Sequence, residues 1–198
     1  MKAHSTKHKT SAIQLISLLL LLGISGTASA HPGHDASGLL AGLLHPFGGM
    51  DHLLAMLAVG LWAGQSGMRR VWLLPAVFLS TLAAGAGAAL LLSSLPLIET
   101  GIAASVLVLG LITALSLKVP VAPSIALTAA LGLVHGYAHG IEIPGTAGPV
   151  LYALGFLVAT AALHFSGVSL GLATRGRFAR FAQWLGAAIA LTGLWMLN

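Results

Sequence analysis

Six long apolar stretches, separated by short polar connections, follow one another along most of this chain. They cover residues 38–64, 71–92, 98–117, 121–139, 148–168 and 180–197. Each is close to the roughly 20 residues that an α-helix needs to cross a bilayer, although the first is longer and is interrupted by proline and glycine. The connections hold charged residues, prolines and glycines, as expected for turns. The pattern predicts an all-α polytopic membrane protein with six transmembrane helices.

A shorter apolar stretch near the N-terminus has the features of a targeting signal. Three lysines fall in the first ten residues, residues 13–24 are mostly apolar, and Ala28-Ser29-Ala30 offers the small side chains of a cleavage site. A segment this short is typical of a cleavable secretory signal peptide. We expect residues 1–30 to be removed, which leaves 31–198 as a six-helix membrane domain. An uncleaved first helix is the alternative.

The composition narrows the class of protein further. The chain is 57% apolar and only 7% charged, and its mean hydropathy is +0.96. Lipid must therefore be the solvent for most of it. The pI near 10.3 does not indicate nucleic-acid binding, because no water-facing domain is left to carry a basic patch. The absence of cysteine excludes disulfides, thiolate metal sites and cysteine nucleophiles.

The charges in the connections predict an orientation. If the mature N-terminus lies outside, every basic residue after the signal peptide falls in a cytoplasmic connection, as the positive-inside rule requires. These residues are Arg69, Arg70, Lys118, Arg175, Arg177 and Arg180. We expect a multi-pass protein of the bacterial inner membrane with both mature termini in the periplasm. Helices one to three and four to six then have opposite orientations, which permits a three-plus-three inverted repeat.

The first apolar stretch contains ionisable residues where lipid would surround them. His45, Asp51 and His52 lie inside it. Asp51 is the one formally charged residue that the predicted orientation does not place near a membrane surface. A carboxylate at that depth costs about 2.5 to 3.5 kcal/mol and is usually functional. In an unbroken helix the two histidines would be about 10.5 Å apart along the axis, too far to share an ion. Pro46 and the glycines after it favour a break that lets them converge; a simple proline kink, with both histidines bonded to backbone carbonyls, is the alternative.

The fourth stretch ends in a second group of such residues. His135 and His139 are four residues apart, so they share one helix face and can bind one ion together. Glu142 follows near the outer surface, where it either supports a histidine as a hydrogen-bond acceptor or is simply a solvated carboxylate. The topology places both groups in the outer half of the membrane. Imidazole and carboxylate ligands suit nickel, cobalt, zinc, copper and iron, so the spacing indicates a divalent metal without selecting one.

Other residues with ligand atoms are weaker candidates. His164 lies alone in the fifth stretch, which favours a packing role. Met50 and Met56 offer thioethers, but methionine in an apolar helix is usually a filler of space. His31 and His34 would form either a loose metal collector at the mature N-terminus or an unstructured polar tail.

Two segments together resemble a known family. His45-Pro46, Gly49, Asp51-His52-Leu53-Leu54-Ala55-Met56 and Ala58-Val59-Gly60 resemble the opening motif of the HupE/UreJ family of nickel permeases, and His135-Gly136, Ala138-His139-Gly140 and Glu142 resemble its second histidine-rich segment. The resemblance implies a transporter and not an enzyme, with no resident cofactor. It implies import of nickel, or of cobalt in some members, that supplies hydrogenase or urease maturation. It also implies that His45, Asp51 and His52 handle the metal, supported by His135, His139 and Glu142.

Competing functions use the same residues differently. The same fold could carry cobalt or another divalent ion. A haem-binding electron-transfer subunit of the membrane would use paired histidines as axial ligands. An intramembrane metallopeptidase is disfavoured because the chain has no His-Glu-x-x-His motif, and no ATP-binding motif is present to power transport.

Overall fold

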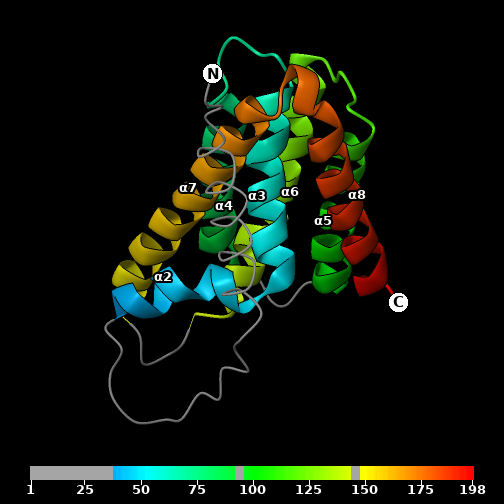
Figure 1. Ribbon diagram of the computed structural model, residues 1–198. Coiled ribbons are helices and arrows are strands. Elements are labelled where there is room, and N and C mark those ends of the chain that lie inside the picture. Colours follow the sequence, from blue (N-terminus) through cyan, green and yellow to red (C-terminus); the bar gives the residue numbers. More distant parts are fainter. Residues whose placement is uncertain (1–37, 92–95, 144–147) are drawn as a thin grey trace, which may run out of the picture. The chain divides into compact units, whose positions relative to one another are not determined.

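The computed structural model describes residues 38–91, 96–143 and 148–198, which belong to one unit of the chain (Figure 1). Its elements are α2 (Gly38–Gly48), α3 (Met50–Gln65), α4 (Leu73–Ala89), α5 (Ile98–Ala114), α6 (Val121–Ile141), α7 (Pro149–Ala173), the 3-10 helix η1 (Gly176–Phe178) and α8 (Ala179–Met196). No strand occurs among these residues, so the all-α prediction is confirmed for them. The predicted signal peptide, His31 and His34 lie outside the described residues.

Several of the helices are long and apolar enough to cross a membrane. Helices α6 and α7 meet this requirement singly, and α2 and α3 meet it as a pair that is bent by 83° at the break between them. Helices α4 and α5 are apolar but only 17 residues long. The described residues therefore form a helical protein suited to a membrane. That the chain crosses the membrane six times stays a prediction.

The helices associate in three principal pairs: α4 with α6, α3 with α7, and α5 with α8. Successive helices from α3 to α8 alternate in direction (Figure 1). Glycines permit close approach within these pairs. Gly60 and Gly64 of α3 face Gly167 and Gly171 of α7, where an added Cβ would clash with the opposite backbone. Such contacts between small residues hold helices together in lipid, where burial of apolar surface supplies no driving force.

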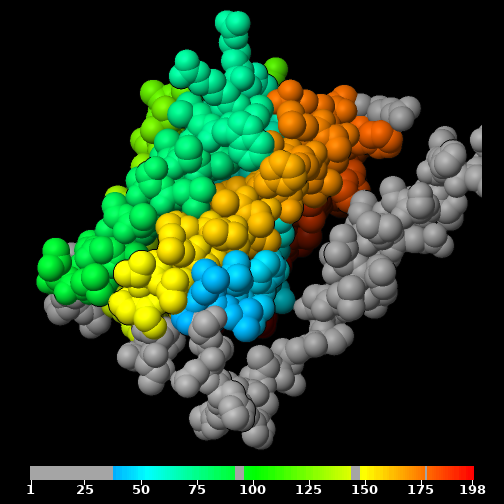
Figure 2. All heavy atoms as spheres, turned by 90° about the vertical axis from the view of Figure 1, so that its left-hand side faces the viewer, coloured from blue at the N-terminus to red at the C-terminus, as the bar shows by residue number. Residues whose placement is uncertain are grey.

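The break between His45 and His52 that the sequence predicts is confirmed, and it falls at Gly49. Pro46 lies inside α2, whose buried face consists of Gly38, Gly42 and Pro46. Gly42 packs on the backbone of α7 at Tyr152, and Figure 2 shows α2 lying against the first turns of α7. The chain then turns at Gly49, whose extended backbone precedes the first turn of α3.

Helix α3 lies at the centre of the described unit, in contact with α4, α5, α7 and α8. Ten of its residues are buried, including Met56, Val59 and Trp62 in the hydrophobic core. Because Asp51 and His52 occupy its first turn, the central position of α3 brings both residues up to the surrounding helices.

Candidate metal centre

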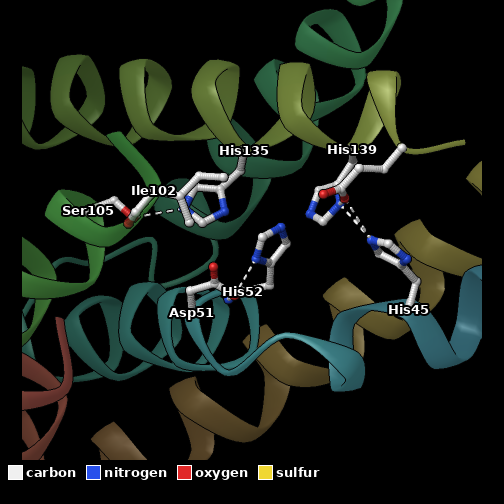
Figure 3. Close-up of polar contacts among 8 residues, drawn as sticks. His45, Asp51, His52, Ile102, Ser105, His135 and His139 are labelled. Carbon is white, nitrogen blue, oxygen red and sulfur yellow. Dashed lines mark hydrogen bonds and ion pairs between the residues drawn. The ribbon is translucent and has the colours of Figure 1, made fainter. Parts of the chain in front are cut away.

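Three histidines from two helices point toward one another in the interior, and we name them the buried trio. They are His52 of α3 with His135 and His139 of α6, and they are 7%, 0% and 3% exposed. One ligand nitrogen from each lies within 4.8 Å of the other two. Figure 3 shows the three rings converging on a shared space. Among the residues that the structure describes, the buried nitrogens His52 Nε2, His135 Nδ1 and His139 Nε2 have no hydrogen-bond partner.

The opposite nitrogen of each ring in the buried trio is held by a neighbour. His52 Nδ1 donates to Asp51 Oδ1 over 2.6 Å, and that oxygen also accepts the His52 backbone N–H over 2.8 Å. His135 Nε2 lies 2.8 Å from Ser105 Oγ. Such partners fix the tautomer and the orientation of a metal-binding imidazole. The arrangement leaves one ring nitrogen of each histidine able to bind an ion.

A second group, which we name the rim trio, shares His139 with the buried trio. His45 Nε2, His139 Nδ1 and Glu142 Oε2 form it, with distances of 3.0 Å between the nitrogens, 3.2 Å from His45 to Glu142 and 3.4 Å from His139 to Glu142. Ligands about 2.1 Å from an ion lie about 3.0 Å apart in an octahedron and about 3.4 Å apart in a tetrahedron. The rim trio thus has the spacing of a coordination shell.

Glu142 follows the last residue of α6, in the connection to α7, and its side chain is 42% exposed. Hydrogen bonds from His139 and His45 hold the pKa of the Glu142 carboxyl well below its usual range, because they stabilise the ionised form. Glu142 is therefore an anion in contact with two histidines. Of the two roles that the sequence left open, these contacts are those of a hydrogen-bond acceptor, and the side chain is also partly exposed.

The rim trio opens on a cavity of about 510 Å³. Its lining includes His45, Asp51, His52 and Glu142, together with Glu99 of α5. The carboxylates give this cavity a negative charge, which attracts cations. Of the buried trio, His52 lines this cavity.

The structure brings together all of the residues predicted for the site: His45, Asp51, His52, His135, His139 and Glu142. Sequence reasoning missed Ser105 and Glu99. Ser105 is one of three hydroxyl residues in the apolar helix α5, and such hydroxyls commonly bond only the backbone of their own helix. The acidic side chain of Glu99, in the first turn of the apolar helix α5, was a usable signal for a cation route.

The weaker candidates lie elsewhere. Met56 is fully buried in the core, and Met50 is 60% exposed. His164 of α7 is 1% exposed and has no hydrogen bond from either ring nitrogen. Its ring packs on Phe78 at 5.2 Å, and Phe78 in turn lies 5.6 Å from the ring of His135.

The fold and the site together define a helical membrane protein with a histidine and carboxylate cluster in its interior. The chain belongs to the HupE/UreJ family, because the family model described as HupE / UreJ protein matches residues 19–196. Protein HupE of Rhizobium leguminosarum bv. viciae is 39% identical over 185 residues, which cover 93% of this chain and 97% of that protein. No solved structure matches the chain.

Proposed function

We propose that this protein is a secondary permease that imports Ni²⁺ across the bacterial inner membrane and so supplies hydrogenase or urease maturation. The observation that carries the proposal is the buried trio, in which one ligand nitrogen of each ring lies within 4.8 Å of the other two and, among the described residues, one buried nitrogen of each ring has no hydrogen-bond partner. Unsatisfied buried nitrogens are costly, and a divalent ion bound by all three would remove that cost. Membership of the HupE/UreJ family supports metal transport as the use of such a site.

The two trios suggest a route for the ion. The rim trio is nearer to the surface and includes an anionic carboxylate, so it would receive the ion and replace part of its water shell. His139 faces both trios, with Nδ1 toward His45 and Glu142 and Nε2 buried without a partner. A neutral imidazole has one lone pair available to a metal. His139 would therefore bind the ion through Nδ1 in the rim trio and through Nε2 in the buried trio, passing one ion at a time.

We further propose six membrane spans, a cleaved signal peptide of residues 1–30, and periplasmic mature termini. The basic connections after α3, α5 and α7 lie together at the end of the helices opposite α2 (Figure 1), and Lys118 and Arg175 line one cavity there. This supports a cytoplasmic face at that end and a periplasmic metal centre.

The helix pairing supports the inverted repeat. In such a repeat α3 corresponds to α6, α4 corresponds to α7, and α5 corresponds to α8. The pair α3 and α7 then corresponds to the pair α6 and α4, and the pair α5 and α8 corresponds to itself. All three are the principal pairs of the structure. A pseudo-twofold repeat requires this relation, and it would place the site where the two lead helices, α3 and α6, meet.

Cobalt is the closest competing substrate, because imidazole and carboxylate ligands suit both ions. The haem alternative has less support. Axial histidines bind from opposite faces of a porphyrin, whereas the rings of His52 and His139 have centroids only 4.1 Å apart and nearly perpendicular planes.

Uptake of radiolabelled nickel into cells tests the proposal, with unlabelled cobalt and zinc as competitors. Wild-type protein should accumulate nickel, and His135→Ala should abolish uptake at equal membrane abundance. His164→Ala, which removes a buried histidine outside both trios, is the matched control and should retain uptake. Equal uptake by His135→Ala and wild type would refute the role of the buried trio.

A further inference from the structure

Ser105 of α5 contacts the buried trio through a hydroxyl that has two neighbours. The residue is 1% exposed. Its Oγ lies 2.6 Å from the backbone oxygen of Ile102 and 2.8 Å from His135 Nε2, as Figure 3 shows. A serine hydroxyl has one proton to donate and lone pairs with which to accept. The position of that proton decides which nitrogen of His135 is free.

The contact with Ile102 determines where the proton goes. A carbonyl oxygen can only accept, so at 2.6 Å the hydroxyl must donate to it, as serine in a helix commonly does toward the preceding turn. If the proton pointed to His135 instead, two oxygen lone pairs would face each other at that distance. The hydroxyl therefore presents a lone pair to His135, and His135 Nε2 must be the donor.

The proton on Nε2 settles the state of the other ring nitrogen. A neutral imidazole has a single N–H, so His135 Nδ1 keeps its lone pair. This is the nitrogen that is buried without a partner in the trio. In the opposite tautomer, Nδ1–H would point at the other rings as an unsatisfied buried donor, and no lone pair would be left for a metal.

We propose that Ser105 is a positioning residue that holds His135 in the Nε2-protonated tautomer, so that Nδ1 is the nitrogen offered to the ion. The effect on metal binding rests on the proposed function, whereas the tautomer is a property of the metal-free protein. The buried trio is then asymmetric, because His52 and His139 offer Nε2 and His135 offers Nδ1.

The partners of the trio also differ in charge. A carboxylate partner raises the basicity of a ligating histidine, and Asp51 supplies one to His52. Ser105 orients His135 without adding charge. His135 is therefore a weaker ligand than His52, which suits a site that must release its ion.

Nitrogen NMR of metal-free protein tests the tautomer directly. Wild-type protein labelled with ¹⁵N-histidine should be recorded in micelles at mildly alkaline pH, where imidazoles are neutral, and the signals of His135 identified by their loss in His135→Ala. We expect a protonated Nε2 and an unprotonated Nδ1. A proton on Nδ1 of His135 would overturn the proposal, whatever the variants show.

Three variants test whether Ser105 is the cause. Ser105→Ala should let His135 populate both tautomers and should weaken Ni²⁺ binding by roughly 10-fold, the usual effect of losing such a partner. Ser105→Thr keeps the hydroxyl and should restore both properties. Ser124→Ala is the matched control, because Ser124 of α6 is fully buried and, within the described part of the chain, bonds only the backbone of Pro120 and Val119.

The outcomes separate this inference from the proposed function. If Ser105→Ala keeps the wild-type tautomer, Ser105 does not position His135, even if binding falls. If wild-type protein binds no Ni²⁺, the proposed function fails, and the NMR comparison of wild type with Ser105→Ala still decides whether Ser105 sets the tautomer.

Discussion

Replacing Gly49 by alanine should damage the metal centre while leaving the backbone unstrained. Gly49 separates α2 from α3 with φ −113° and ψ 124°, angles that alanine adopts as readily as glycine. The difficulty is space around the side chain. A Cβ at this position would lie 2.7 Å from Asp51 Oδ1 and 3.3 Å from His52 Nδ1.

The structure sets the size of the effect. Asp51 Oδ1 must retreat by about 0.7 Å to reach an ordinary contact of 3.4 Å with the new methyl group. The three distances place the methyl group and His52 Nδ1 in nearly perpendicular directions from Oδ1, so a shift of about 0.7 Å away from the methyl group would lengthen the 2.6 Å hydrogen bond to about 2.8 Å and displace the carboxylate sideways from His52. Complete loss of a carboxylate partner of a metal-binding histidine typically lowers affinity about 10- to 100-fold, or about 1.4 to 2.8 kcal/mol, so this displacement should lower nickel affinity by no more than about 10-fold.

Gly48→Ala provides the matched control, because a Cβ on Gly48 meets nothing within 4 Å. Nickel affinity of both purified variants should be measured by titration calorimetry, with abundance and thermal stability recorded alongside. We expect Gly49→Ala to bind nickel more weakly than wild type, by up to about 10-fold, and Gly48→Ala to bind it normally. Normal binding by Gly49→Ala, or an equal loss in both variants, would refute the reasoning.

Four further results are expected. Asp51→Asn should reach the membrane but lose nickel uptake, because it removes the charge that supports His52; uptake at the wild-type level would exclude an essential carboxylate. Uptake into proteoliposomes without an inward proton gradient should fall as external pH drops through the range in which histidine takes up protons, because protons compete with the ion for neutral histidines; flat or rising uptake would contradict histidine ligation. Equilibrium dialysis should find one Ni²⁺ per chain at saturation, because both trios need His139, and two ions would show that the trios fill independently. N-terminal sequencing of the mature protein should begin at His31 and a C-terminal reporter should be active in the periplasm; an intact Met1 or a cytoplasmic C-terminus would overturn the topology.

The sequence was most informative where a residue type was out of place. Asp51 and the histidines around it are costly in lipid, so their positions alone indicated a site, and the spacing of His135 and His139 put both on one helix face. The need for His45 and His52 to converge predicted a break in the first apolar stretch. Hydrophobicity likewise predicted where the helices lie, since membrane helices need long apolar segments.

The details that the sequence could not supply depend on tertiary contacts. Pro46 and the glycines after it predicted a break between His45 and His52 without fixing its position; Pro46 is accommodated in α2, and the chain turns at Gly49. The position of the turn depends on the packing of α2 on α7, which no local sequence pattern encodes. The contact of Ser105 with His135 and the double use of His139 also required the helices to be placed in space.

X-ray absorption spectroscopy at the nickel edge of the metal-loaded protein tests the central claim most directly, because it identifies the atoms bound to the ion. The account predicts nickel bound by imidazole nitrogens from more than one histidine, with imidazole scattering reduced in His135→Ala and unchanged in His164→Ala. A shell of oxygen ligands without imidazole, or a spectrum that His135→Ala does not alter, would contradict the claim that the buried trio holds the transported ion.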